Sequence, residues 1–202
     1  IICIPGNAGT KKIAKNIKTD ISDFDSIYQI IKTNNIDLVI IGPEQPLVDG
    51  IVDYLDKKNI KVFGPNKFAS QLEGSKAFMK NLCKKNNIPT AKFGIFDNFE
   101  NASNFIKKSE MPIVIKADGL AAGKGVVICA SVNEALKSAK EFLSGKFKSS
   151  KKLVVEEFLQ GEELSYFVIV DDISYRFFGA AQDHKRVGEG DVGPNTGGMG
   201  AY

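Results

Sequence analysis

A glycine-rich stretch with two lysines, residues 112–130 (PIVIKADGLAAGKGVVICA), could bind a ligand that carries several negative charges. Glycine adopts backbone angles closed to other residues and exposes bare N–H groups, which suits a loop wrapped around phosphate oxygens. Lys116 ends the apolar run before the loop, and Lys124 lies inside it. The loop glycines are Gly119, Gly123 and Gly125. The pattern predicts phosphate binding; an ordinary glycine-rich hairpin with solvent-facing lysines is the alternative.

This loop differs from a Walker A loop. Walker A has four residues between its first glycine and the Gly-Lys pair, which Ser or Thr follows. Here three residues separate Gly119 from Gly123, and Gly125 follows Lys124. The chain also continues from residue 126 as a strand, whereas a Walker A loop opens a helix. We therefore expect a strand–loop–strand flap that closes over phosphates.

Composition limits the other classes of function. The 202 residues are 43% hydrophobic and 25% charged, as in ordinary globular domains. No apolar run approaches the roughly 20 residues that span a bilayer. The net charge of +3 is mild and the lysines are dispersed, so neither nucleic acid nor a membrane is an expected partner. Cys3, Cys83 and Cys129 form no CxxC and indicate reduced thiols of a cytoplasmic protein. With His184 as the single histidine, any metal should be a hard ion held by oxygen ligands.

The first part of the chain alternates short apolar strands with amphipathic helices. Strand-like runs occur at 1–4, 37–41 and 61–63. One helix is expected after a cap at Ser22 and another near Pro46. This alternation predicts an α/β domain with a doubly wound parallel sheet. Ligands of such sheets bind beyond the carboxyl ends of the strands, where Glu44 lies; a solvent-facing carboxylate is the alternative.

From residue 92 the pattern changes to a small α+β unit that carries the flap. Its strands are expected at 93–96, 113–117, 126–130 and 153–157. Ser131 and Glu134 predict a capping box at the start of one of its helices. Before this unit, a helix capped by Ser75 has Lys76 in its first turn, where a bound anion would explain a cation better than solvent does.

Acidic and basic residues follow the last of these strands. Glu156 and Glu163 flank a turn that could offer backbone groups to a flat base and a carboxylate to ribose hydroxyls, although acidic turns are common. A hairpin is expected at 165–181, with its turn at Asp171-Asp172. The last stretch, 182–202, combines many glycines with Asp-His-Lys-Arg and predicts a substrate-facing loop; a disordered tail is the alternative.

Five motifs together resemble the phosphoribosylamine–glycine ligase (glycinamide ribonucleotide synthetase) family, which are ATP-grasp enzymes of purine synthesis. These motifs are GPEQPL, GSKAFMK, PIVIKADGLAAGKGVV, VVEEFLQGEELS and QDHKRVGEGDVGPNTGGMGAY. The flap and the last run are the specific ones. The resemblance implies ATP and Mg²⁺ (or Mn²⁺), glycine and 5-phosphoribosylamine as small-molecule partners, and a monomeric full-length enzyme.

The resemblance also implies a domain organisation. An N-terminal Rossmann-like (pre-ATP-grasp) domain without its first strand would occupy 1–71, and a connecting helix 72–92. An ATP-grasp lid subdomain would occupy 93–162, and the start of a truncated central ATP-grasp domain 163–202. Family members begin with one more strand and a glycine-rich turn, and continue through metal-binding residues and a C-terminal domain. We therefore expect a fragment that is inactive alone, with the metal ligands beyond residue 202.

Matching positions carry implied roles. The residues implied to bind the ATP phosphates are Lys76, Lys116, Gly119, Gly123, Lys124 and Gly125. Those implied to hold adenine and ribose are Glu156, Phe158, Leu159 and Glu163. Those implied to face glycine and phosphoribosylamine are Glu44, Asp183, Lys185, Arg186, Asn195, Thr196, Gly197 and Gly198. The catalytic residues among them would be Lys116, Lys124, Asp183 and Arg186.

In the implied reaction the carboxylate of glycine attacks the γ-phosphate, and the amine of phosphoribosylamine captures the resulting glycyl phosphate. Such phosphoryl transfer needs positioning and positive charge more than a protein nucleophile, and no convincing Ser–His or Cys–His pair is present. The alternatives are another ATP-grasp carboxylate–amine ligase and a non-catalytic ATP-binding module. A dinucleotide-binding dehydrogenase domain is least supported, because no GxGxxG follows the first strand.

Overall fold

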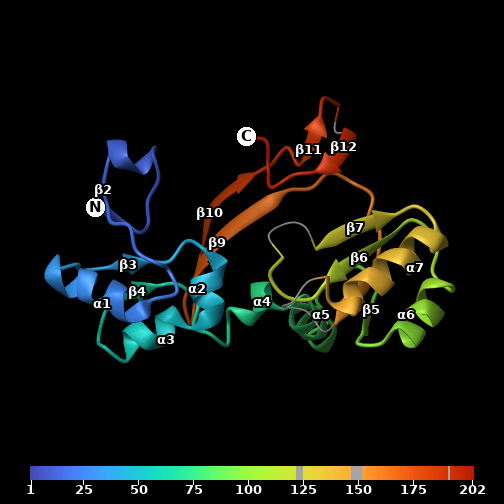
Figure 1. Ribbon diagram of the computed structural model, residues 1–202, viewed down its shortest axis with the longest axis horizontal. Helices are drawn as coiled ribbons and strands as arrows, with labels where there is room; N and C mark the ends of the chain where they lie inside the picture. Colours follow the sequence, from blue (N-terminus) through green and yellow to red (C-terminus); the bar gives the residue numbers. More distant parts are fainter. Residues whose placement is uncertain (122–124, 147–151, 191) are drawn as a thin grey trace. The chain divides into compact units, whose positions relative to one another are not determined.

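The computed structural model describes residues 1–121, 125–146, 152–190 and 192–202. The chain forms two compact units, Ile1–Asn86 and Asn87–Tyr202, each of which is described by itself (Figure 1). In the part of the chain that the structure describes, no helix combines the length and the apolar character needed to cross a membrane.

The N-terminal unit combines parallel strand pairs with short helices. Strand β1 (Ile2–Cys3) pairs with β2 (Lys15–Asn16), and β3 (Val39–Ile40) pairs with β4 (Val62–Phe63), both in parallel. The helices are η1 (Thr10–Lys12), α1 (Phe24–Thr33), α2 (Glu44–Asp49), α3 (Ile51–Asp56), α4 (Gln71–Gly74) and α5 (Lys76–Lys85). Gly50, with a φ of 101°, separates α2 from α3 where we expected one helix. The predicted α/β fold with parallel strands is confirmed, although the strands are shorter than predicted.

The core of this unit lies between α1 and α3. Ile27 and Ile31, one turn apart on α1, are buried against Ile51 and Leu55 of α3. Beside them is a largely apolar cavity of about 670 Å³, lined by residues of β1, α1 and β3 among others. A cavity of this size means that the apolar surfaces of β1 and β3 are only partly covered within the unit.

The cap of α1 corrects one local prediction. Asp23, not Ser22, caps the helix, because its Oδ1 accepts a hydrogen bond from the Ser26 N–H at 3.0 Å. The other carboxylate oxygen accepts from the Ser26 hydroxyl at 2.7 Å. Ser22 instead donates its N–H and its hydroxyl to Asp20. The predicted cap was therefore wrong by one residue.

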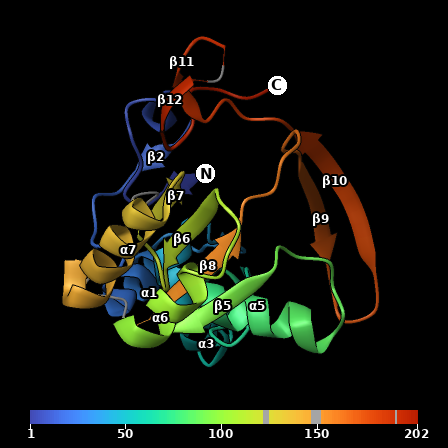
Figure 2. The same ribbon diagram turned by 90° about the vertical axis from the view of Figure 1, so that its right-hand side faces the viewer.

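The second unit contains a four-stranded antiparallel sheet in the order β5-β8-β6-β7 (Figure 2). Its strands are β5 (Phe93–Phe96), β6 (Ile113–Ala117), β7 (Val126–Cys129) and β8 (Leu153–Glu157). The helices are α6 (Phe99–Ile106), α7 (Val132–Glu141) and the short η2 (Phe142–Lys146). The four predicted strands are confirmed, and only β7 ends one residue earlier than expected.

The two faces of this sheet have different character. One face packs against α6 and α7 and is apolar: Ile113, Ile115, Ala117, Cys129, Leu153 and Val155. Because successive side chains of a strand point to opposite faces, Lys116 and Glu156 lie on the other face. The sheet therefore separates a hydrophobic core from a face that carries two charged residues predicted to bind a ligand, Lys116 and Glu156.

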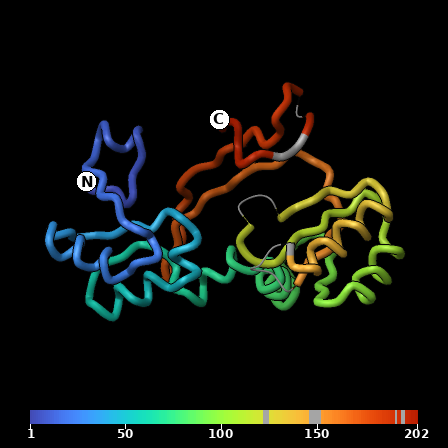
Figure 3. The backbone as a smooth tube through the Cα atoms, in the orientation of Figure 1, coloured from blue at the N-terminus to red at the C-terminus, as the bar shows by residue number. Residues whose placement is uncertain are grey.

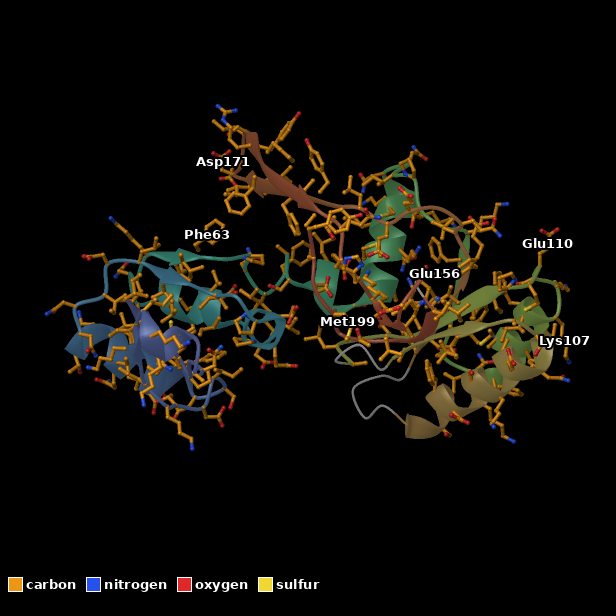
Figure 4. The ribbon with its side chains drawn as sticks, turned by 90° about the horizontal axis from the view of Figure 1, so that it is seen from above. Phe63, Lys107, Glu110, Glu156, Asp171 and Met199 are labelled. Carbon is orange, nitrogen blue, oxygen red and sulfur yellow. The ribbon has the colours of Figure 1, made fainter. Side chains whose placement is uncertain are left out.

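Two hairpins follow the sheet in the sequence. Strands β9 (Ser165–Val170) and β10 (Tyr175–Ala181) form an antiparallel ribbon (Figure 3). At its tip, Asp171 Oδ1 accepts the backbone N–H groups of Ile173 and Ser174 at 3.0 and 2.7 Å, which confirms the predicted turn (Figure 4). Strands β11 (Arg186–Gly188) and β12 (Val192–Asn195) form the second hairpin.

Candidate functional site

Lys116 and Glu156 form an ion pair on the sheet face opposite α6 and α7. Lys116 Nζ lies 2.9 Å from Glu156 Oε2. Lys116 is directly opposite Val154 in the antiparallel register, and Glu156, which is labelled in Figure 4, follows Val154 two residues later on the same face. The glutamate side chain is 5% exposed and the lysine side chain 27% exposed. The partly exposed ammonium can therefore also contact an anion at this face.

The loop between β6 and β7 is closely packed where it leaves and re-enters the sheet. The Ala117 N–H donates to the Gly125 carbonyl at 2.8 Å. A Cβ on Gly125 would lie 2.6 Å from the Cβ of Ala121 and 3.3 Å from the Cβ of Ala117. Gly119 has a φ of 85°, in the left-handed region that favours glycine. Gly125 thus allows a close approach of the backbone, and Gly119 allows a backbone conformation that other residues rarely adopt.

Glu163, Asp183 and Lys185 form a charged cluster in the second unit. The Lys185 ammonium contacts Glu163 Oε1 and lies 4.0 Å from Asp183 Oδ1. The side chains are 64%, 32% and 42% exposed for Glu163, Asp183 and Lys185 respectively. The structure thus brings together three predicted site residues, and a ligand can reach all of them.

The residues around this cluster are held by hydrogen bonds. The Lys185 carbonyl accepts the N–H and the hydroxyl of Thr196 at 2.7 and 3.0 Å. Thr196 Oγ1 in turn accepts the Gly198 N–H at 3.0 Å. Arg186 Nη1 donates to the Gly193 carbonyl at 2.7 Å, across the β11–β12 hairpin. The end of the chain therefore has a defined hydrogen-bonded arrangement, and its predicted contact with substrates stays a prediction.

The structure describes the other predicted site residues within their own units. Glu44 is the exposed first residue of α2. Lys76 is the first residue of α5, after the cap Ser75, which confirms the predicted helix start. In the second unit, Phe158 is half-buried and Leu159 is 65% exposed in the loop after β8.

Three predicted positions lie wholly or partly outside the described residues. Gly123 and Lys124 lie outside the described residues. The backbone of Asn195 belongs to β12, and its side chain is not among those described. Gly197 is exposed, with space around the position of a Cβ. Among the described residues, no group of three or more His, Cys, Asp or Glu side chains could hold a metal ion.

Sequence reasoning missed two features of the site. It did not predict that Lys116 and Glu156 meet, since hydrophobic periodicity does not tell which strands are neighbours. It also gave no role to His184, whose ring lies against that of Tyr202 with 5.5 Å between the centroids. The place of His184 in the consecutive Asp-His-Lys-Arg run was the signal that the sequence offered.

Cys129 is a core residue and not a nucleophile. Its side chain is fully buried in the hydrophobic cluster beneath the sheet. Desolvation by this burial raises the pKa of the Cys129 thiol, which disfavours the reactive thiolate.

The sheet, the glycine loop and the charged face define the class of protein: residues 74–202 match the model of an ATP-grasp domain. Solved structures with low sequence identity share the fold. The biotin carboxylase domain of Hydrogenobacter thermophilus 2-oxoglutarate carboxylase, in complex with MgADP, has a TM-score of 0.72 at 19% identity, over 92% of this chain and 45% of that one.

The chain belongs to the phosphoribosylglycinamide synthetase family, whose N-domain model matches residues 1–73 and whose ATP-grasp (A) domain model matches 74–202. The finer predicted division at 71, 92 and 162 stays a prediction.

Individual relatives agree with this family. The phosphoribosylamine–glycine ligase of Mesorhizobium japonicum is 51% identical over 98% of this chain and 47% of its own length. The chloroplastic phosphoribosylamine–glycine ligase of Arabidopsis thaliana is 49% identical over 100% of this chain and 39% of its own length. The crystal structure of the Thermotoga maritima phosphoribosylamine–glycine ligase has a TM-score of 0.82 at 35% identity, over 99% of this chain and 48% of that one. The chain thus spans about half the length of most of the relatives it matches.

Proposed function

We propose that the natural polypeptide containing this chain joins glycine to 5-phosphoribosylamine, with conversion of ATP to ADP and phosphate. The observation that carries this proposal is the Lys116 ammonium, which lies at the end of β6 beside the glycine loop. Relatives named phosphoribosylamine–glycine ligase, 44–51% identical across the chain, support the choice of substrates.

The partly exposed Lys116 ammonium suits a nucleoside triphosphate, because it can donate to phosphate oxygens. A Cβ at Gly125 would collide with the Cβ of Ala121, so the close approach of the backbone at this point of the loop requires glycine. We assign the phosphates to Lys116, Lys76, Lys124 and the loop glycines Gly119, Gly123 and Gly125. We assign adenine to Glu156 and the backbone near Phe158 and Leu159, and the ribose to Glu163. When bound, ATP would supply the phosphoryl group, and Mg²⁺ or Mn²⁺ would accompany it.

The proposed reaction has two steps. An oxygen of the glycine carboxylate attacks the γ-phosphorus while the bond to the bridging oxygen breaks, which gives glycyl phosphate and ADP. The amine of phosphoribosylamine then attacks the acyl carbon, phosphate leaves, and the nitrogen loses a proton. Ammonium groups such as Lys116 favour the first step, because they stabilise negative charge on the transferred group.

The substrates are assigned to the charged cluster and the segment that surrounds it. Asp183 can accept hydrogen bonds from an ammonium or amine, whereas Lys185 and Arg186 can donate to a carboxylate or phosphate. The segment from Asn195 to Gly198 is assigned to the substrates as well, and so is Glu44. These groups bind and orient the reactants, and none of them has to act as a nucleophile.

The test measures ADP release by the purified natural polypeptide. ADP release that requires both glycine and phosphoribosylamine is the expected result. Release with a different carboxylate or amine would instead favour another ATP-grasp ligase. Nucleotide binding without turnover on any pair of substrates would indicate a non-catalytic module. Full ligase turnover after both Lys116 and Lys124 are changed to alanine would contradict the proposed phosphate site.

A further inference from the structure

Lys185 connects two carboxylates that belong to different parts of the chain. Its ammonium contacts Glu163 Oε1, 22 residues earlier in the sequence, and lies 4.0 Å from Asp183 Oδ1. Glu163 precedes β9, whereas Asp183 and Lys185 follow β10, so the whole β9–β10 ribbon lies between them in the sequence. A single side chain therefore links the turn after the sheet to the last segment.

The backbone of Lys185 also holds the neighbouring turn. Its carbonyl accepts both the N–H and the hydroxyl of Thr196, and the same hydroxyl accepts the N–H of Gly198. These bonds do not involve the ammonium, so the side chain can move while the Lys185 backbone keeps its contacts with the segment assigned to substrate binding.

The charges of the cluster suit a response to ligands more than a contribution to stability. Exposed ion pairs contribute little to folding, and Glu163 and Lys185 are 64% and 42% exposed. Two carboxylates share one ammonium, so the cluster keeps a net charge of −1. Each carboxylate also retains lone pairs for further hydrogen-bond donors.

Ligand hydroxyls and the Lys185 ammonium compete for Glu163. Hydroxyl groups that donate to this carboxylate weaken its hold on the ammonium, which can then move toward Asp183 or toward the carboxylate of an incoming amino acid. Because both ligands act on one charged group, binding of the first changes the affinity for the second. Linkage makes this effect reciprocal.

We propose that Lys185 is a positioning residue that couples nucleotide binding to amino-acid binding. Ribose hydroxyls that donate to Glu163 release the Lys185 ammonium, which then moves toward Asp183 and the carboxylate of glycine. This inference rests on the proposed function, which assigns ribose to Glu163 and glycine to the region of Asp183. It adds that the two affinities depend on each other through one side chain.

The experiment measures the affinity for MgADP with and without saturating glycine, by titration calorimetry on the natural polypeptide. In the wild type we expect glycine to tighten MgADP binding at least about fivefold, the lower end of typical coupling. In Lys185→Gln the ratio should fall to about one, and the KM for glycine should rise more than kcat falls. Lys185→Arg keeps the charge and should keep most of the coupling.

A matched control is available in the same unit. Lys92 Nζ lies 3.9 Å from Glu157 Oε2, and the lysine side chain is 90% exposed. Lys92→Gln removes an exposed ion pair of the same kind outside the cluster, so the coupling ratio should stay at the wild-type value.

Two results would overturn the inference. One is a coupling ratio of about one in the wild type, and the other is an unchanged ratio in Lys185→Gln. If Lys185→Gln folds poorly, Glu163→Gln removes the charge at the other end of the link, and retained coupling there overturns the inference equally. Failure of the proposed function is distinct, since it would be a lack of glycine-dependent ADP release by the wild type.

Discussion

Lys116 Nζ lies 2.9 Å from Glu156 Oε2, although the family resemblance assigns the lysine to phosphate and the glutamate to adenine. The two residues come from neighbouring antiparallel strands and are 40 positions apart in the chain. The pair places opposite charges side by side on one face of the sheet. A bound nucleotide would therefore meet an ammonium that already has a carboxylate partner, and this partner restricts where the ammonium lies.

Replacement of Lys116 tests the role of this ammonium. Lys116→Gln should lower kcat/KM for ATP about 100-fold or more, because one donor that stabilises developing charge is lost. It should also lower the free energy of unfolding by about 1–3 kcal/mol, since a buried carboxylate loses a hydrogen-bond donor. Steady-state kinetics and urea unfolding measure the two effects. Lys107→Gln, at the end of α6, is the control and should leave both unchanged (Figure 4). Unaltered kinetics in Lys116→Gln would contradict the assignment.

A methyl group at Gly125 should disturb the loop that follows β6. The added Cβ would lie 2.6 Å from the Cβ of Ala121, closer than packing permits, and the strain should destabilise the chain by about 1–3 kcal/mol. The measurement is urea unfolding of Gly125→Ala beside Gly179→Ala. Gly179 lies in β10 with open space around its Cβ position, so its substitution should have a much smaller effect. Equal effects of the two changes would show that the close packing at Gly125 does not matter.

Local elements were predictable from the sequence, whereas their partners were not. The strand bounds of the four-stranded sheet followed from apolar runs, and Ser131 caps α7 as predicted, with its Oγ accepting the Glu134 N–H at 3.3 Å. The Glu134 carboxylate, however, reaches the Ala130 N–H at 2.9 Å and not the N–H of Ser131 that a standard capping box uses. The position of β8 between β5 and β6 depends on tertiary packing, which the hydrophobic periodicity of the sequence does not encode. The Lys116–Glu156 pair follows from that strand order and was missed for the same reason.

The N-cap of α1 gives a prediction in the other unit. Asp23→Ala should lower the thermal stability near neutral pH, because the Ser26 N–H and hydroxyl lose their acceptor. Ser22→Ala, next to it, is the control and should have a smaller effect. Thermal unfolding monitored by circular dichroism compares them, and a larger loss for Ser22→Ala would restore the cap predicted from the sequence.

The same cap should make part of the stability depend on pH. Hydrogen bonds from the Ser26 hydroxyl and N–H hold the pKa of Asp23 below its usual value. A folded-state pKa below the unfolded one stabilises the protein above about pH 4, and this contribution is lost as the pH falls through the folded pKa. The difference in melting temperature between the wild type and Asp23→Ala should therefore shrink in acid. A difference in melting temperature that grows in acid would contradict this prediction.

Tyr54 gives the opposite dependence at high pH. Its hydroxyl donates to Asp25 Oδ1, and this hydrogen bond is the main cause that raises the pKa of Tyr54 to about 12. Because the folded pKa exceeds the unfolded value of about 10, the stabilisation is complete below pH 10 and is lost as the pH rises through about 12. The melting-temperature difference between wild type and Tyr54→Phe should therefore be constant below about pH 10 and decrease above it. Absorbance titration of the phenolate provides a second readout: the group that titrates near 12 should be absent in Tyr54→Phe and present in the control Tyr175→Phe. Asp25→Asn should move this titration toward lower pH, because the negative charge that opposes ionisation is gone; a titration that stays in place would mean that Asp25 is not its cause.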